Sequence, residues 1–303
     1  MHTTKISAQS SSEQATLSIE CPSPVPSPHK PDRKKAIAVL TANGLSLLIV
    51  LLFCGACATQ EPDSSPLALR VLTYNIHHGE GTDGRLDLER IAALMLEHRP
   101  DLVALQEVDR GTTRTQKRDL AAELGRLTGM ETLFSKNIDF QGGEYGNAIL
   151  SRHRILSSTN LHYRMLRPGE QRGLLQATIQ CAGREIVFMA THLDYRPDPA
   201  ERLSNVEEIK AAAQKSGKPV ILAGDFNDHP DRDVHRAMKT MFLDAWEQGG
   251  SGDGFTYSSA SPKSRIDYVY CYPPGRWQVT RAEVLQSPAS DHLPVLFHLS
   301  LRE

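Results

Sequence analysis

Several short segments of the sequence place an acid, an amide or an imidazole at the end of an apolar run. The residues concerned are Asn75, Glu107, Asn147, His192, Asp225, Asn227, Asp267, Asp291 and His292. Carboxylate and amide oxygens are the ligands that Mg²⁺ and Mn²⁺ prefer, and imidazole can exchange protons near neutral pH. The two cysteines of the folded part, Cys181 and Cys271, do not stand at zinc-ligand spacing, so a hard cation is favoured over zinc. Such a set is suited to the attack of water on a phosphoester.

Each of these residues also has a purely structural interpretation. An Asn or Asp after a strand is often a turn or cap residue, and a single His is often a surface or core residue. The functional hypothesis therefore rests on the whole set, because α/β proteins assemble their sites where neighbouring strands end. His77, His78 and His229 lie close to the set in sequence, and we expect them to be bystanders.

The elements that must position these residues are mostly strands. Apolar and alternating runs predict strands at 69–76, 102–107, 131–135, 147–151, 155–162, 174–181, 185–191, 219–224, 265–271, 278–286 and 294–301. Helical periodicity predicts helices from Asp87 to Pro100, over 118–128 and over 199–215. The excess of strands predicts an α/β fold in which two β-sheets pack face to face with helices outside.

The motifs TYNIHHG, LQEV, YGNAILSR, THLD, GDFN, RIDYVY and SDHLPV occur in this order between Leu69 and Leu301. This ordered set resembles the endonuclease/exonuclease/phosphatase superfamily of metal-dependent phosphohydrolases, which includes deoxyribonucleases, sphingomyelinases and inositol-polyphosphate 5-phosphatases. The resemblance implies a four-layer αββα sandwich of two mixed sheets and a Mg²⁺ (or Mn²⁺) cofactor.

The resemblance also implies roles around the metal and the attacking water. Glu107 matches the principal metal ligand, with Asn75 and Asp291 beside it. Asp225 matches the residue that positions or deprotonates the water. Asn227 would donate a hydrogen bond to the phosphoryl oxygens as charge builds on them.

The remaining roles concern the phosphate. His292 matches the essential histidine near the scissile phosphate, and Asp267 the acid that orients it. His192 matches a second phosphate-binding or general-acid group, and Asn147 is either phosphate-binding or a structural amide. A non-catalytic binding module that kept this fold should have lost part of the set, and none is missing. The sequence therefore predicts an enzyme, a metal-dependent phosphoric ester hydrolase.

The N-terminal part has the composition of an export signal. Residues 1–35 form a Ser/Pro-rich segment, which we expect to be a disordered tail, and it ends in a basic cluster. Residues 36–57 are apolar and uncharged and predict a signal or anchor segment. The residues around Cys57 resemble a bacterial lipoprotein processing site, so Cys57 is the candidate for lipidation, and an uncleaved anchor helix is the alternative. A linker over 58–66 then leads to the catalytic domain at 67–303. We expect the domain to lie in the bacterial cell envelope on the exported side of the membrane.

The two cysteines of this domain, Cys181 and Cys271, do not make a disulfide framework. We expect two packed thiols, although an exported domain could also form a single bridge.

The charge balance bears on the substrate. The chain has a formal net charge of −2, and residues 1–65 carry equal numbers of basic and acidic residues, so the domain keeps this charge. A nuclease that grips several phosphates would be more basic. The sequence therefore favours a small or lipid-derived phosphoester over DNA, with a monomeric domain, and an extracellular or periplasmic endonuclease is the alternative. Two basic groups could still hold DNA, namely Arg110, Arg114, Lys117 and Arg118, and Arg164, Arg167 and Arg172.

Overall fold

The computed structural model describes residues 66–302 of the chain. Strand β1 (Leu67–Asn75) carries apolar side chains on both of its faces. Leu69 and Val71 pack into a hydrophobic cluster that includes residues of both sheets, whereas Leu72 and Tyr74 pack into a second cluster with helical residues. Because successive side chains point to opposite faces of a strand, this pattern places β1 in a layer that is covered on both sides.

Two mixed six-stranded sheets form the centre of the fold. The strand orders are β11-β12-β1-β2-β4-β3 and β5-β6-β7-β8-β10-β9. Neighbours are antiparallel except for β1 with β2 and β7 with β8. The other strands of the first sheet are β2 (Leu102–Arg110), β3 (Glu131–Phe140), β4 (Gly143–Ser151), β11 (Trp277–Val284) and β12 (Val295–Leu301). Those of the second are β5 (Arg154–His162), β6 (Gly173–Cys181), β7 (Arg184–His192), β8 (Val220–Asp225), β9 (Leu243–Asp244) and β10 (Asp267–Tyr272).

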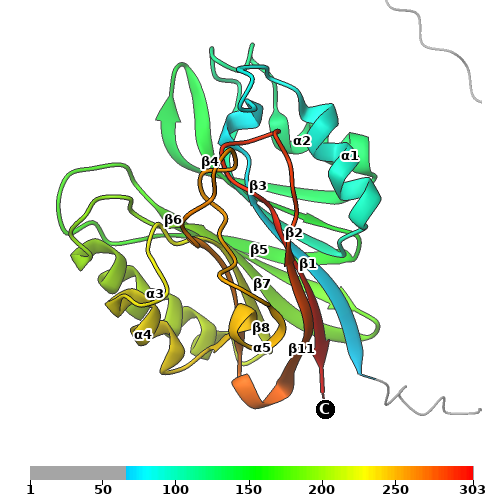
Figure 1. Ribbon diagram of the computed structural model, residues 1–303, viewed down its shortest axis with the longest axis vertical. Coiled ribbons are helices and arrows are strands. Elements are labelled where there is room, and N and C mark those ends of the chain that lie inside the picture. The colour runs from blue at the N-terminus through cyan, green and yellow to red at the C-terminus, as the bar shows by residue number, and fades with distance from the viewer. Residues whose placement is uncertain (1–65, 303) are drawn as a thin grey trace, which may run out of the picture. The chain divides into compact units, whose positions relative to one another are not determined.

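The helices cover the outer faces of the two sheets (Figure 1). Helices α1 (Leu88–His98) and α2 (Leu120–Thr128) pack on the first sheet, and α3 (Ala200–Ser216) and α4 (Asp233–Lys239) on the second. The remaining short elements are α5 (Ala245–Gly249) and the 3₁₀ turns His77–Gly79 and Pro274–Arg276. The predicted four-layer αββα sandwich is therefore confirmed. Within residues 66–302, the helices lack the length and apolar character that crossing a membrane requires.

Local signals in the sequence explain several element boundaries. Asp87 caps α1, since its side chain accepts a hydrogen bond from the Arg90 backbone N–H at 3.1 Å. Gly129 ends α2 in the left-handed conformation with φ of 70°. The β6–β7 hairpin turns at Ala182 and Gly183, both with positive φ, as a two-residue type I′ turn requires.

The sequence did not predict α4 and α5, which are too short for a helical period to be recognised. It also predicted too short a strand at 131–135, because β3 runs on to Phe140 and pairs there with β4. The added part of β3 is mostly polar and only half-buried, so it has the composition of a loop.

The cysteines of the described part are buried free thiols, as expected. Cys181 and Cys271 both belong to the cluster between the sheets. Burial raises the pKa of the Cys181 thiol to about 12 and that of Cys271 further still. Both are therefore protonated, unreactive core residues.

Packing between the sheets predicts a measurable cost for losing one methylene group. Ile221 is fully buried in this cluster. Ile221→Val should lower the free energy of unfolding by about 0.5–1.5 kcal/mol, measured by urea denaturation. The same kind of truncation at Leu156, which is 39% exposed, should change it by no more than about 0.5 kcal/mol. Equal effects at both positions would contradict the assignment of Ile221 to the core.

Candidate active site

The predicted site residues gather at one edge of the space between the two sheets. On five strands, the side chains that face the partner sheet change from apolar to polar at this edge. The polar residues are Asn75 on β1, Asn147 on β4, His192 on β7, Asp225 on β8 and Asp267 on β10. Asp225 is in register with both His192 and Asp267 on its two neighbouring strands. The site is thus a polar continuation of the inner core.

The Asn75 amide joins the two sheets. Its Nδ2 donates to Glu107 Oε1 at 3.1 Å and to Asp225 Oδ2 at 3.0 Å. Its Oδ1 accepts a hydrogen bond from the backbone N–H of His77 at 3.1 Å, which fixes the orientation of the amide. Asn75 therefore holds the carboxylates of Glu107 and Asp225 on either side of one donor group.

A bulge in β2 brings Glu107 into the site. Strict alternation would place Glu107 on the same face as Leu105, beneath the helices. The β2–β4 register shifts by one residue between Leu105 and Val108, and Glu107 has a left-handed φ of 57°. Leu105 and Val108 consequently both pack beneath the helices, and Glu107 turns toward Asn75. Bulges and left-handed non-glycine residues are features of functional sites.

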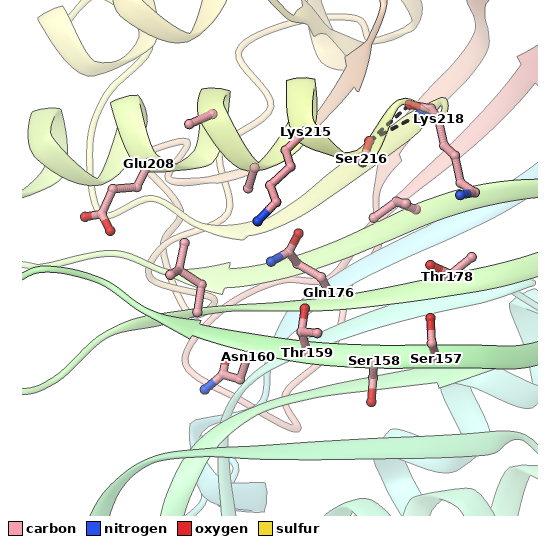
Figure 2. Close-up of a pocket in the computed structure, with 14 residues that line it drawn as sticks. Ser157, Ser158, Thr159, Asn160, Gln176, Thr178, Glu208, Lys215, Ser216 and Lys218 are labelled. Atoms are coloured by element: carbon pink, nitrogen blue, oxygen red, sulfur yellow. Dashed lines mark hydrogen bonds between the residues drawn. The ribbon is translucent and has the colours of Figure 1, made fainter.

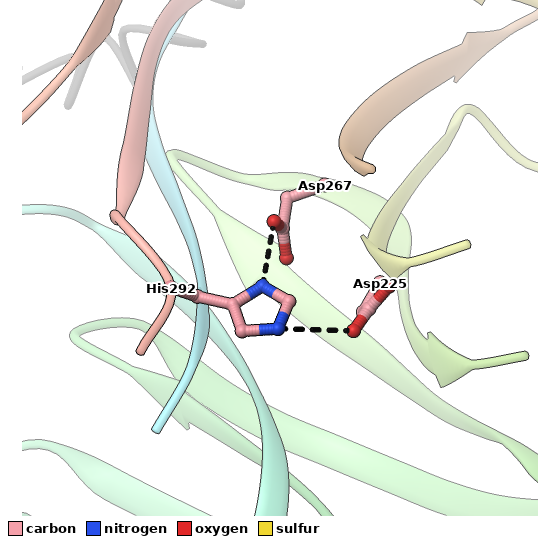
Figure 3. A group of neighbouring side chains, drawn as sticks. All are labelled: Asp225, Asp267 and His292. Atoms are coloured by element: carbon pink, nitrogen blue, oxygen red, sulfur yellow. Dashed lines mark hydrogen bonds and ion pairs between the residues drawn. The ribbon is translucent and has the colours of Figure 1, made fainter. Parts of the chain in front are cut away.

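His292 lies between two carboxylates (Figure 3). Its Nδ1 is 2.9 Å from Asp267 Oδ2, and its Nε2 is 3.7 Å from Asp225 Oδ2. These three side chains are close enough to ligate one ion. The short bond to Nδ1, however, fits an acid that orients a histidine, so we interpret Asp267 as the partner of His292 and not as a metal ligand.

The buried charges shift the pKa values of this group. Burial is the largest influence on His292 and opposes its charge, but Asp267, Asp225 and Asp291 together raise the pKa of His292 to about 10. Burial, followed by the charge of Asp267, raises the pKa of Asp225, and His292 opposes this shift. His292 is therefore the charged partner at neutral pH, and Asp225 is a stronger base than an ordinary carboxylate.

His192 and Asn227 lie on the other side of Asp225. His192 Nε2 is 3.0 Å from Asn227 Nδ2 and 3.5 Å from Asp225 Oδ2. Burial, and then the charges of Arg172 and His292, lower the pKa of His192 well below its usual value. The backbone N–H of Asn227 donates to Asp225 Oδ1 at 2.8 Å, which fixes the Asp225 carboxylate. A neutral imidazole and an amide thus lie next to the Asp225 carboxylate.

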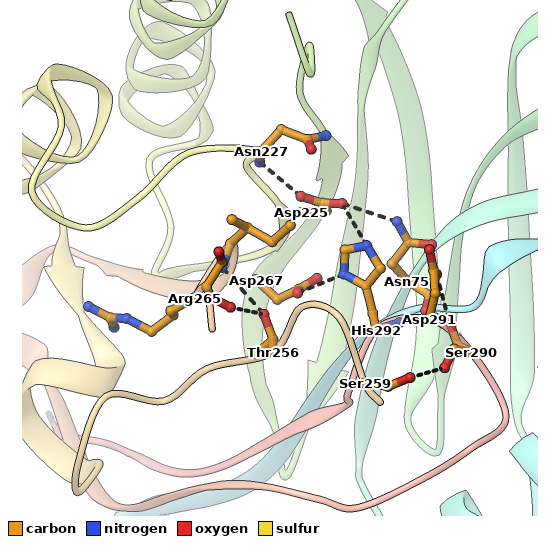
Figure 4. A network of polar contacts seen from close by, with 12 residues as sticks. Asn75, Asp225, Asn227, Thr256, Ser259, Arg265, Asp267, Ser290, Asp291 and His292 are labelled. Atoms are coloured by element: carbon orange, nitrogen blue, oxygen red, sulfur yellow. Dashed lines mark hydrogen bonds and ion pairs between the residues drawn. The ribbon is translucent and has the colours of Figure 1, made fainter. Parts of the chain in front are cut away.

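The remaining predicted residues are Asp291, Asn147 and Cys57, and Figure 4 shows Asp291 beside Asn75 and Ser290. Asp291 accepts a hydrogen bond from Ser290 Oγ at 3.3 Å, and the same hydroxyl donates to the Asn75 backbone carbonyl at 2.7 Å. Asn147 is buried and donates through Nδ2 to the Gly173 carbonyl at 3.3 Å, which accounts for one of its amide groups structurally. Cys57 lies outside the described residues.

Two further residues lie near the site. Arg172, which the sequence placed in a basic group that could hold DNA, is only 5% exposed, and its charge lowers the pKa of His192. The side chain of Tyr257 is 41% exposed, and its ring centroid lies 4.9 Å from that of His292. The one signal for Arg172 was its position immediately before the apolar strand β6, and Tyr257 has no signal.

A hollow away from this site is lined by other residues. A hollow of about 690 Å³ lies between α3 and the outer face of β5 and β6 (Figure 2). Its lining includes Gln176, Thr178 and Lys215 and none of the predicted site residues. We therefore place the chemistry at Asp225, Asp267 and His292 and not in this hollow.

The charges of the site fit a divalent cation. The carboxylates of Asp225, Asp267 and Asp291 act on the charged imidazole of His292, and Glu107 shares the Asn75 amide with Asp225. Burial raises the pKa of Asp225 most and the nearby charge of Asp267 raises it further, so a bound cation would stabilise the ionised carboxylate. Hard oxygen donors match Mg²⁺ or Mn²⁺, with Glu107 as the donor that is not engaged by His292.

The pairing of His292 with Asp267 can be tested without substrate. In metal-free protein the pKa of His292 should be about 10 by NMR titration, and Asp267→Asn should lower it by about 1–3 pH units because an opposite charge is removed. His235 is an internal control, since burial lowers its pKa to about 3 and it lies against Tyr270. An unchanged His292 titration in Asp267→Asn would show that the pair does not set the charge.

Comparison with known proteins gives relatives of the same architecture. Mouse nocturnin is 27% identical over 210 residues, which is 59% of this chain and 48% of nocturnin. A 5'-tyrosyl-DNA phosphodiesterase of Caenorhabditis elegans is 29% identical over 216 residues, 65% of this chain and 52% of that protein. The structure of a mannosyl-6-phosphatase of Bacteroides thetaiotaomicron has a TM-score of 0.65 at 20% identity and covers 76% of this chain and 99% of that chain.

The chain spans about half the length of these two sequence relatives. The sequence profile of the Endonuclease/Exonuclease/phosphatase family, in contrast, matches residues 72–292, which is more than half of the chain and includes the site from Asn75 to His292. The chain therefore belongs to the Endonuclease/Exonuclease/phosphatase family.

Proposed function

We propose that this protein is a divalent-metal-dependent hydrolase of phosphoester bonds that uses in-line attack by an activated water. The observation that carries the proposal is the Asn75 amide bonded to both Glu107 and Asp225, with His292 against the same Asp225 oxygen. Family membership supports phosphoester hydrolysis. The complete polar set argues against the alternative of a non-catalytic binding module.

Each side chain has a distinct task in this reaction. Asp225 accepts a proton from the water whose oxygen bonds to phosphorus while the bond to the leaving oxygen breaks, and its raised pKa suits it to this task. Asn227 and His192 lie beside Asp225 and can donate to phosphoryl oxygens as their charge increases. His292 stays charged because Asp267 holds its Nδ1.

Glu107, with Asn75 and Asp291 beside it, would hold Mg²⁺ (or Mn²⁺). When bound, the cation offsets the negative charge of the phosphoryl group.

For the substrate, we favour a small or lipid-derived phosphoester over DNA. The domain has a net negative charge, and most cations of the two basic groups form ion pairs, Arg167 with Asp198 and Arg172 with Glu170 among them. Arg110 is paired with Glu144, Arg114 with Asp109 at 2.7 Å, and Arg118 with Glu123 at 2.6 Å. Paired cations release few counterions on binding DNA, so they contribute little affinity. The name of the nematode relative keeps an endonuclease or DNA phosphodiesterase as the alternative.

We further propose that the protein is exported and tethered to the membrane of the bacterial envelope as a monomer. The support is the sequence of residues 36–57 and the processing-site pattern at Cys57. Cys57→Ala should block lipid labelling and leave an intact precursor. Unchanged labelling would reject lipidation at Cys57.

The decisive assay uses the full chain with Mg²⁺, Mn²⁺ or EDTA and four substrates. These are plasmid DNA, bis-p-nitrophenyl phosphate, p-nitrophenyl phosphate and sphingomyelin, with Glu107→Ala as the blank. Cleavage of a small ester or the lipid, lost with EDTA, would support the proposal. Plasmid nicking with a steep salt dependence would favour the nuclease. Silence on all four substrates would favour the binding module.

A further inference from the structure

An ion pair beside the site has no task in the reaction described above. Arg172 is 5% exposed, and its Nη1 lies 3.0 Å from Glu170 Oε1. Among residues 66–302, neither Arg172 Nε nor Glu170 Oε1 has a hydrogen-bond partner, although both atoms are buried. A buried guanidinium usually donates several hydrogen bonds, so Arg172 has donor capacity left for another anion.

The residue after Arg172, Gly173, lies at the edge of the site. The carbonyl of Gly173 accepts hydrogen bonds from Asn147 Nδ2 at 3.3 Å and from Thr191 Oγ1 at 3.1 Å. Arg172 therefore directly precedes Gly173, whose carbonyl bonds to Asn147 on β4 and to Thr191 on β7. Thr191 is the residue before His192. The charge of Arg172 lowers the pKa of His192, and the charge of Glu107 acts on Glu170. The pair is thus within electrostatic range of both sides of the site.

The described site has donors for a phosphate but few cations. A phosphoester would add negative charge to a group that already contains Glu107, Asp225 and Asp267. The planar fork of arginine matches two oxygens of one phosphate, and a charge-assisted pair of this kind is strong in a partly dry site. In the free protein, the carboxylate of Glu170 supplies the anion that Arg172 requires.

We propose that Arg172 binds an oxygen of the substrate's phosphoryl group and that Glu170 occupies this arginine until the phosphate replaces it. The proposal rests on the proposed function, because it assumes that a phosphoester enters this site. Glu170 is suited to leave: its side chain is 29% exposed, and its Oε1 accepts no aligned hydrogen bond from the described residues. As a built-in competitor, Glu170 would weaken the binding of free phosphate and so limit inhibition by the product.

The test measures the affinity of the full chain for inorganic phosphate by calorimetry in the presence of Mg²⁺. Glu170→Gln removes the competing charge and should tighten phosphate binding by about 3- to 10-fold. Arg172→Gln should weaken it by about 10-fold or more, because a hydrogen bond to a charged group contributes about 1.5–3 kcal/mol. In the double variant, the gain from Glu170→Gln should disappear, because Glu170 acts through Arg172.

Two controls separate this from a general change of charge or stability. Glu123→Gln on α2 also removes one carboxylate charge from an ion pair, since Glu123 lies 2.6 Å from Arg118. It should leave phosphate binding unchanged. Arg172→Lys keeps the positive charge without the fork and should give an intermediate affinity. Thermal unfolding of each variant verifies that the fold is retained.

Three results would overturn the proposal. First, Glu170→Gln could tighten phosphate binding even when Arg172 is replaced. Second, Glu170→Gln could weaken Mg²⁺ binding, which would identify Glu170 as a metal ligand. Third, all variants could have the same phosphate affinity. Hydrolysis with unchanged phosphate affinities would reject the Arg172 assignment alone. The expected pattern of phosphate affinities without hydrolysis of any ester would reject the proposed function alone.

Discussion

Asp225→Asn is expected to lower kcat by about 10²- to 10⁴-fold, the loss typical of a missing general base. An amide cannot accept the proton of the attacking water. The substitution preserves the shape of the side chain, and its one remaining oxygen can still accept from either Asn75 Nδ2 or the backbone N–H of Asn227. The reaction then loses its base while the site stays assembled.

The measurement is kcat with saturating Mg²⁺ on whichever small ester the full chain hydrolyses. Asp244→Asn is the matched control. Asp244 is also a buried acid, and burial raises its pKa, but it pairs with Arg265 at 3.5 Å outside the site. Asp244→Asn should lower stability and leave kcat of the folded protein unchanged. Near-normal kcat in correctly folded Asp225→Asn protein would remove Asp225 from the mechanism.

Much of the fold could be predicted because its signals are local. The apolar run of β8 ends at Asp225, and the positive-φ positions Ala182 and Gly183 separate two alternating strands. The caps at Asp87 and Gly129 fixed helix ends without any tertiary information. Short helices such as α4 carry too few residues to show a period, and their existence depends on packing against the second sheet.

The site was predictable as a set of residues but not as a geometry. Asn75 and Asp225 are the last residues of β1 and β8, and Asp267 is the first residue of β10, which runs antiparallel to β8, so all three lie at one edge. The turn of Glu107 into the site depends on the β2 bulge, which no sequence period reveals. The sequence placed Arg172 in a basic group that could hold DNA, but its burial to 5% exposure depends on tertiary packing that no local pattern reveals. The segment around Cys57 lies outside the described residues, and its role stays a prediction.

Glu107→Gln should produce a loss of a different kind from Asp225→Asn. Glu107 accepts from Asn75 at 3.1 Å, and a glutamine oxygen can keep this hydrogen bond. The negative charge that attracts the cation is lost. Losing a residue that only supports a metal ligand already lowers metal affinity by roughly 10- to 100-fold, so Mg²⁺ affinity should fall by at least this factor. At low Mg²⁺ concentration kcat/KM should fall by a similar factor.

The two variants can be separated by a Mg²⁺ titration of activity. High Mg²⁺ should restore much of the activity of Glu107→Gln, because mass action refills a weakened site, and none of that of Asp225→Asn, because the missing base is not a question of occupancy. Glu144 lies on β4 and is paired with Arg110. Glu144→Gln neutralises this carboxylate and should leave the midpoint of the Mg²⁺ titration unchanged. If excess Mg²⁺ rescued Asp225→Asn and not Glu107→Gln, the roles of the two carboxylates would have to be exchanged. The Asn75 amide that joins them would then bind the water-activating residue on β2 and the metal ligand on β8.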